Sequence, residues 1–251
     1  MTTSLGGSAD GDAPMIEGHI ARAFDGALLA LHLKIVEMGG LALDQAGEAM
    51  RAYEDWNLPA ANRVMERERA VNAYDREIDR AQLTLIARRH PVGSDLRIII
   101  AMSKMVGELE RVGDEAKKIA RVVIDDTGRP AGATARDAVH LGQLAQDLLR
   151  MALDAVDRLD FELAARVIPG DRELDVEYAA GLRRLLTRAM ENPRGFEVTV
   201  KAAFVLKSLE RIGDHARNLA RHVLSMQAMD TEAQTPEPVP AQTQTPPEPS
   251  A

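Results

Sequence analysis

Apolar residues recur every three or four positions through most of this chain, the spacing that places them on one face of an α-helix. Clusters rich in Gly, Pro and Asn interrupt the pattern and divide it into segments. The segments predict long antiparallel helices at about 16–56, 59–89, 94–127, 134–159, 162–190 and 196–229.

Local signals qualify several of these helices. Gly39-Gly40 weakens the first, because a glycine inside a helix costs about 1 kcal/mol relative to alanine. Pro59 is expected in the first turn of the second helix, where its missing N–H leaves no helical hydrogen bond unmade. Ser94 or Asp95 is expected to cap the third helix, and Pro169-Gly170 marks a point where the fifth could be interrupted.

One stretch of the chain is repeated within the sequence. Leu109 to Val123 reads LERVGDEAKKIARVV and Leu209 to Val223 reads LERIGDHARNLARHV, an offset of one hundred positions. Upstream, Arg63-Val64-Met65 matches Arg166-Val167-Ile168 at an offset of 103, and the difference falls in the intervening turn. The repeat predicts an all-α protein built from two tandem three-helix bundles.

The repeat and the composition of the two ends predict the domain organisation. Residues 1–14, rich in Gly, Ser, Thr and Asp, are expected to be disordered, as is the Pro-, Gln- and Thr-rich tail at 230–251. The first bundle is expected at 15–128 and the second at 129–229, because Gly128-Arg129-Pro130 ends the third helix.

Each copy of the repeat carries two acidic side chains one helical turn apart, Glu110 with Asp114 and Glu210 with Asp214. Two carboxylates at this spacing repel each other by about 0.2–0.5 kcal/mol on an isolated helix. Either a bound cation or nearby basic side chains must offset that repulsion, the latter being Arg111 and Lys117 or Arg211 and Arg217. The spacing alone is common in this chain, at Asp44/Glu48, Asp75/Asp79 and Glu173/Glu177, but its duplication favours a functional role.

A second pair of polar side chains is expected beside each acidic pair. In an antiparallel helical hairpin, residues equidistant from the turn lie side by side, so Glu68 should be level with Asp114 and Asn72 with Glu110. Oxygen-rich clusters without cysteine suit hard or borderline cations. Glu110 and Asp114 fall at the edge of the buried face of their helix, so the cluster is expected to line an exposed groove. The expected ligands are Glu68, Asn72, Glu110, Asp114, Asp171, Asp175, Glu210 and Asp214.

The composition narrows the possible functions. The chain has 251 residues and no cysteine, which excludes disulfides and thiolate metal sites. Its net charge of −8 argues against nucleic-acid binding through phosphate contacts. The N-terminus lacks a signal-peptide pattern, and we find no run of about 18 apolar residues. We therefore expect a cytoplasmic protein without direct membrane insertion.

These motifs resemble the PhoU family of phosphate-specific transport accessory proteins, over nearly the whole of residues 15–228. The duplicated Leu-Glu-Arg-Val/Ile-Gly-Asp segment is the specific part of the resemblance. Supporting pieces are His19-x-x-x-x-Phe24-Asp25, Val71-Asn72 after Glu68, and His90-Pro91-Val92 to Asp95-Leu96-Arg97. The resemblance implies two similar three-helix bundles with pseudo-twofold symmetry and a tendency to form a homodimer.

The resemblance also implies a function. Family members act in the cytoplasm with a phosphate ABC transporter, through its ATPase subunit, and with a sensor histidine kinase. They repress phosphate-starvation genes and restrain phosphate uptake when phosphate is sufficient. The resemblance further implies clusters of divalent or ferric ions (iron, manganese, magnesium or zinc) on the eight positions given above, where Asn72 departs from a strict acidic pair. No enzymatic activity is expected.

Two alternatives remain open at the level of sequence. A carboxylate-bridged di-metal enzyme would use a repeated Glu-x-x-His motif inside a bundle core, whereas this chain offers one related match, Asp137-x-x-His140. A helical scaffold without metal is the other alternative. His215, next to Asp214, is a weaker candidate ligand because Glu115 takes its place in the first copy.

Overall fold

The computed structural model describes residues 13–126, 128–130, 132–191 and 195–233. Within these ranges the chain forms six α-helices and no strand, which confirms the predicted all-α class. The helices are α1 (Ala13–Asp55), α2 (Leu58–Arg89), α3 (Gly93–Ile124), α4 (Ala133–Arg158), α5 (Phe161–Glu191) and α6 (Phe196–Ala233).

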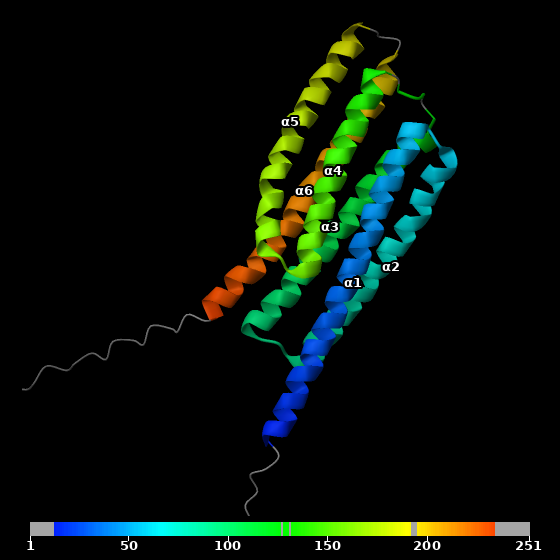
Figure 1. The fold of residues 1–251 in the computed structure, drawn as a ribbon. Coiled ribbons are helices and arrows are strands. Elements are labelled where there is room, and N and C mark those ends of the chain that lie inside the picture. Colours follow the sequence, from blue (N-terminus) through cyan, green and yellow to red (C-terminus); the bar gives the residue numbers. More distant parts are fainter. Residues whose placement is uncertain (1–12, 127, 131, 192–194, 234–251) are drawn as a thin grey trace, which may run out of the picture.

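The helices form two three-helix bundles that lie side by side (Figure 1). In one bundle α1, α2 and α3 pack on one another, and in the other α4, α5 and α6 do the same. The bundles are joined mainly through α3 against α6, with α1 against α4 as a second contact, so α2 and α5 lie on the outside. The two helices that carry the repeated motif therefore meet at the centre of the molecule.

Small side chains allow the helices to approach closely. Ala42, Ala46 and Ala49 on α1 are at most 1% exposed, and α4 buries alanines in the same way. Buried residues of both bundles form one continuous apolar cluster, with Tyr53 as its largest fully buried side chain. This dense packing suits a sequence in which aromatic residues make up only 3%.

Two features that weaken helices in isolation leave these helices unbroken. Helix α1 continues through Gly39-Gly40. A Cβ at Gly39 would lie 2.5 Å from Leu153 Cδ2 of α4, so the glycine permits close contact between the bundles. Helix α5 continues through Pro169, and no interruption occurs at Pro169-Gly170. Tertiary packing thus overrides local propensity at both positions.

Helix ends agree with the sequence at one predicted position and differ at another. The side chain of Asn57 caps α2 by accepting a hydrogen bond from the Ala60 N–H at 3.0 Å, and a proline follows in the first turn as expected. The predicted cap of α3 by Ser94 or Asp95 is wrong. The N-cap is Val92, without a side-chain hydrogen bond, because the helix already begins at Gly93.

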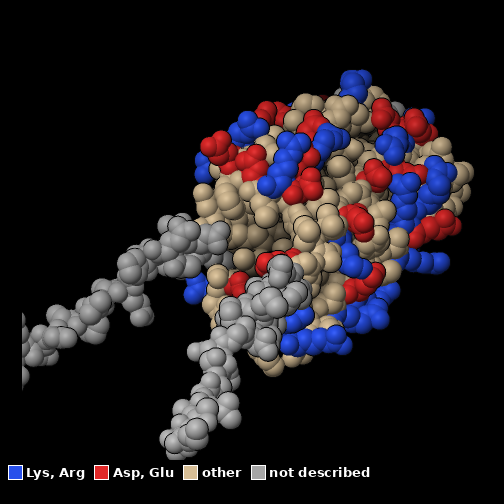
Figure 2. Space-filling view, turned by 60° about the horizontal axis from the view of Figure 1, so that its bottom comes forward, with Lys and Arg blue, Asp and Glu red and all other residues tan. Residues whose placement is uncertain are grey.

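One stretch of α1 differs from the expectation that no segment could span a membrane. Phe24–Asp55 is long enough to do so, and an 18-residue window within it is apolar enough, with a mean hydropathy of 1.5. Only 28% of that window is buried, although α1 packs against α2, α3 and α4, and a single such helix is weak evidence for a membrane span. On the face seen in Figure 2, Lys, Arg, Asp and Glu side chains surround an area of uncharged residues.

The two ends that were predicted to be disordered, 1–14 and 230–251, fall almost wholly outside the described residues, because residues 1–12 and 234–251 are not described. Where the chain is described, α1 already begins at Ala13 and α6 continues to Ala233, so both helices extend slightly beyond their predicted limits.

Candidate functional site

The first predicted cluster assembles where α2 lies against α3. Glu68 on α2 is buried, and Asp114 on α3 is partly exposed. The ammonium group of Lys117 lies 3.3 Å from Glu68 Oε1 and 3.3 Å from Asp114 Oδ1, so it bridges the two helices. Asn72 donates a hydrogen bond to Glu68 Oε1 at 3.1 Å. Glu68 and Asp114 therefore lie at the same level of the two helices, as expected for residues equidistant from the turn of an antiparallel hairpin.

Negative charge is crowded in this cluster. Partial burial raises the pKa of Glu110, and the neighbouring carboxylates of Asp114, Asp75 and Glu68 raise it further. Burial works against the charge of Lys117, but hydrogen bonds to Glu68 and Asp114 outweigh that effect and raise its pKa. The cluster thus holds more carboxylates than its one ammonium group can neutralise.

The second cluster, between α5 and α6, is built around Arg217. Its guanidinium group forms an ion pair with Asp171 of α5 and another, at 2.7 Å, with Asp214 of α6. Burial raises the pKa of Asp171; the Arg217 hydrogen bond and charge oppose this, and Asp175 and Asp214 add to it. Asp171 Oδ1 is buried and has no hydrogen-bond partner, and Asp175 is exposed.

Glu210 is held differently from its counterpart Glu110. Its Oε2 lies 2.6 Å from the ammonium group of Lys207, which also lies 5.4 Å from the centre of the Tyr178 ring. The position equivalent to Lys207 in the first copy is Gly107, which has no side chain to offer. The two copies therefore neutralise their acidic pairs with different sets of cations.

The repeated glycines lie directly beside these clusters. A Cβ at Gly113 would lie 3.4 Å from Glu68 Oε2, and one at Gly213 would lie 2.0 Å from Leu174 Cδ2. Glycine therefore lets α2 approach α3, and α5 approach α6, at the level of the acidic side chains. This contact accounts for both glycines through helix packing.

The donor set fits a hard cation, although no metal site is ready-made. Among the described residues, no group of three or more His, Asp and Glu side chains is arranged to hold a metal ion. Lys117 and Arg217 instead lie between the carboxylates. The clusters nevertheless offer carboxylate oxygens, one of which, Asp171 Oδ1, is buried and unpartnered. A cation could bind where the basic head groups now lie if those side chains moved away.

Sequence reasoning missed one buried member of the first cluster. Gln45 of α1 is fully buried, and its amide donates to Glu68 Oε2 at 3.1 Å. Its position in the helical pattern gives no sign of this contact. A signal did exist for Lys117 and Arg217, because both occupy the same basic position of the repeat.

Two further carboxylates lie in the contact between α3 and α6. Glu108 is buried and lies 2.7 Å from His215 Nδ1, so this histidine faces the contact between the bundles. Glu115 is also buried, and it holds Lys118 at 2.7 Å and Arg211 at 3.2 Å. The Glu108–His215 hydrogen bond and the Glu115–Arg211 ion pair join α3 to α6 through polar side chains.

Comparison with known proteins identifies sequence relatives along most of the chain. A family model described as the PhoU domain matches residues 35–123 and 138–223. A "phosphate-specific transport system accessory protein PhoU homolog" from Pseudomonas aeruginosa is 40% identical over 209 residues, which cover 82% of this chain and 86% of that protein. The corresponding PhoU protein of Escherichia coli K12 is 32% identical over 212 residues, covering 84% of this chain and 88% of that protein.

Solved structures share the fold. The crystal structure of PhoU from Pseudomonas aeruginosa superimposes with a TM-score of 0.77 and 39% sequence identity, covering 82% of this chain and 99% of that one. A phosphate transport system regulatory protein PhoU from Streptococcus pneumoniae gives a TM-score of 0.75 at 22% identity, covering 81% of this chain and 96% of that one. At that identity the second likeness shows the fold alone.

Proposed function

Because this chain belongs to the PhoU family, we propose that it is an accessory protein of a phosphate-specific transport system that limits phosphate uptake and represses the phosphate-starvation response. The observation that carries the proposal is family membership along both bundles. The names of the relatives support the association with phosphate transport. Negative regulation is our own extension of that association.

We further propose that the protein acts as an adaptor in the cytoplasm, as a homodimer. Its partners would be the ATPase subunit of the phosphate ABC transporter and a sensor histidine kinase. A pair of packed helical bundles with charged helices on the outside supports this role, because such a body offers long exposed faces to two partners. Co-elution of the purified chain with the ATPase subunit in size-exclusion chromatography would test the first contact.

In this proposal each acidic cluster binds a divalent or ferric ion, whether iron, manganese, magnesium or zinc. The unpartnered Asp171 Oδ1 and the crowded carboxylate at Glu110 support it. When bound, the ion would neutralise carboxylates on neighbouring helices and so tie α2 to α3 and α5 to α6. The proposed ligands are Glu68, Asn72, Glu110, Asp114, Asp171, Asp175, Glu210 and Asp214.

A second candidate is a regulatory scaffold that binds no metal. The ion pairs of Lys117 and Arg217 favour it, because they already supply the countercharge that a metal would provide. Elemental analysis of the purified protein separates the two candidates. The metal proposal expects bound metal in the wild type and loss of metal from the second site in the variant Glu210→Ala/Asp214→Ala. Equal metal content in both proteins, with helicity retained, would refute the assignment.

Deletion of the gene tests the regulatory role. A reporter of a phosphate-starvation gene should be expressed in phosphate-rich medium in the deletion strain, and phosphate should accumulate in the cells. The wild-type gene should restore silence. Deleting only residues 232–251, which lie outside both family matches, should leave repression unchanged. A silent reporter in the deletion strain, with no second copy of the gene present, would rule the role out.

A further inference from the structure

A trough follows the contact between α3 and α6. It consists of two cavities of about 560 Å³ and about 430 Å³, which share Glu115, Lys118 and Arg211 in their walls. Each volume falls within the range of about 300–1,000 Å³ that is typical of small-molecule sites. We call these two cavities together the α3–α6 trough.

The α3–α6 trough is positively charged in an acidic protein. Eight Lys and Arg side chains line it against four Asp and Glu, whereas the whole chain has a net charge of −8. Most of these cations have an acidic partner: Lys117 pairs with Asp114, Arg217 with Asp214, Lys201 with Asp125, Lys207 with Glu210 and Arg111 with Glu108. The positive excess therefore comes from Lys118 and Arg211, which share the single carboxylate of Glu115, and from Arg121. A concave surface with an excess of one sign of charge concentrates ligands of the opposite sign. The trough therefore favours an anion.

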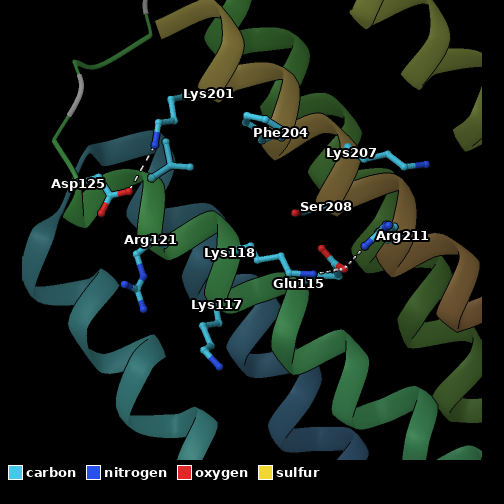
Figure 3. Close-up of a pocket in the computed structure, with 11 residues that line it drawn as sticks. Glu115, Lys117, Lys118, Arg121, Asp125, Lys201, Phe204, Lys207, Ser208 and Arg211 are labelled. Atoms are coloured by element: carbon cyan, nitrogen blue, oxygen red, sulfur yellow. Dashed lines mark hydrogen bonds and ion pairs between the residues drawn. The ribbon is translucent and has the colours of Figure 1, made fainter. Parts of the chain in front are cut away.

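A buried carboxylate orders the cations at the junction of the two cavities. The Glu115 side chain is 5% exposed, and it holds Lys118 and Arg211, which are 53% and 51% exposed (Figure 3). Both charged head groups are thus held by the buried carboxylate, and about half of each side chain remains exposed to a ligand. Pre-ordered side chains lose less entropy when a ligand binds, which favours affinity.

The two cavities differ in polarity. The larger one includes Val122 and the ring of Phe204, which is 62% exposed (Figure 3). The smaller one is lined by charged and polar residues alone, among them Arg111 and Arg211. Guanidinium groups bind phosphate oxygens in pairs, and an exposed aromatic ring offers a face on which a planar group can stack. A ligand with a flat ring at one end and phosphates at the other matches both cavities.

Comparison of the two repeats indicates that the aromatic cavity is not a by-product of the shared helix packing. One hundred positions earlier, Lys201, Phe204, Lys207 and Ser208 correspond to Ala101, Lys104, Gly107 and Glu108. The equivalent half of the α3–α6 contact therefore has a lysine in place of the aromatic ring, lacks the cations of Lys201 and Lys207, and carries an acid in place of a serine. The larger cavity is specific to one half of the molecule.

We propose that the α3–α6 trough binds a nucleoside di- or triphosphate, with the base beside Phe204 and the phosphates on Lys118, Arg211 and Arg111. The phosphate-binding side chains Lys118, Arg211 and Arg111 are not among the proposed metal ligands. Asp114 and Asp214, which are, also line the smaller cavity, so binding is measured without metal. Failure of ATP to bind would leave the proposed regulatory function standing, because that function rests on family membership, and the gene-deletion test of regulation does not measure ATP binding.

Isothermal titration calorimetry on the full-length protein, in EDTA at low ionic strength, tests the site with ATP, sodium tripolyphosphate and adenosine. ATP is expected to bind saturably and more tightly than tripolyphosphate, with adenosine weakest. Arg211→Gln should weaken ATP and tripolyphosphate about tenfold or more, because each loses a charge-assisted hydrogen bond. Phe204→Ala should weaken ATP about fivefold or more and leave tripolyphosphate unchanged.

Arg221→Gln is the matched control, because Arg221 is an exposed arginine of α6 outside the α3–α6 trough. It should leave all three affinities unchanged, and circular dichroism should show equal helicity in every variant. Absence of saturable ATP binding would overturn the proposal. So would equal weakening by Arg221→Gln and Arg211→Gln, since binding would then reflect general charge. Equal affinity for ATP and tripolyphosphate, with no effect of Phe204→Ala, would exclude a nucleotide.

Discussion

Replacing Arg217 by Gln should destabilise the second bundle by an amount that the structure defines. The guanidinium group is the ion-pair partner of Asp171, whose side chain is 3% exposed, and it also pairs with Asp214. The other oxygen of the Asp171 carboxylate is already buried without a hydrogen-bond partner. Without Arg217, Asp171 would remain as a buried and uncompensated charge.

The expected loss is about 3 kcal/mol in the free energy of unfolding at neutral pH. Removing one partner of a buried ion pair typically costs about 3–5 kcal/mol, and the more exposed pair with Asp214 adds at most about 1 kcal/mol. We place the total at the lower end because Asp171 can take up a proton. Burial already raises the pKa of Asp171, and loss of Arg217 would raise it further. The cost should therefore shrink as the pH falls through that raised pKa.

Urea unfolding followed by far-ultraviolet circular dichroism measures the effect. Arg150→Gln is the control, because its ion pair with Asp147 joins side chains that are 54% and 70% exposed, and its loss should cost less than about 1 kcal/mol. The double variant Arg217→Gln/Asp171→Asn should recover much of the lost stability, since no charge remains buried. A loss below about 1 kcal/mol for Arg217→Gln, or a double variant as unstable as the single one, would refute the reasoning.

Three further substitutions probe packing and charge elsewhere. Gly213→Ala should lower the thermal unfolding temperature, because its Cβ would lie 2.0 Å from Leu174 Cδ2 and overpacking costs about 1–3 kcal/mol; Gly107→Ala, with no such neighbour within 4 Å, should raise it. Glu110→Gln should stabilise the protein increasingly as the pH rises above 4.5. Burial and neighbouring carboxylates raise the pKa of Glu110 in the folded protein, so its ionisation favours unfolding. Free energies of unfolding that change with pH in parallel for variant and wild type would contradict this. Tyr53→Phe should cost no stability in urea unfolding, because the buried hydroxyl has no hydrogen-bond partner.

The sequence carried enough information to predict the helices and the level of the acidic side chains. Helical periodicity predicts the helices, and the repeat predicts two bundles. Counting from the turn placed Glu68 beside Asp114, and the ammonium group of Lys117 confirms that these carboxylates are neighbours. This succeeded because an antiparallel hairpin leaves little freedom in how its helices align.

Contacts that depend on how the bundles meet could not be read from the sequence. Gly39 signals a weak helix in isolation, yet it permits close contact with Leu153 of the other bundle. Gln45 reaches Glu68 from α1, and nothing in its periodic position distinguishes it from other buried residues. Helical periodicity is equally compatible with a bound metal ion and with a basic side chain between the carboxylates. It could therefore not predict that the ammonium group of Lys117 lies between Glu68 and Asp114.

Complementation of the deletion strain tests most directly whether the duplicated acidic pairs are the functional centre of a phosphate-starvation repressor. The strain would carry either the wild-type gene or a variant with Ala at Glu110, Asp114, Glu210 and Asp214, produced at equal levels by immunoblot. In phosphate-rich medium the wild-type gene should silence a phosphate-starvation reporter, and the variant should leave it expressed although its helicity is retained. Full silencing by the variant would contradict the account.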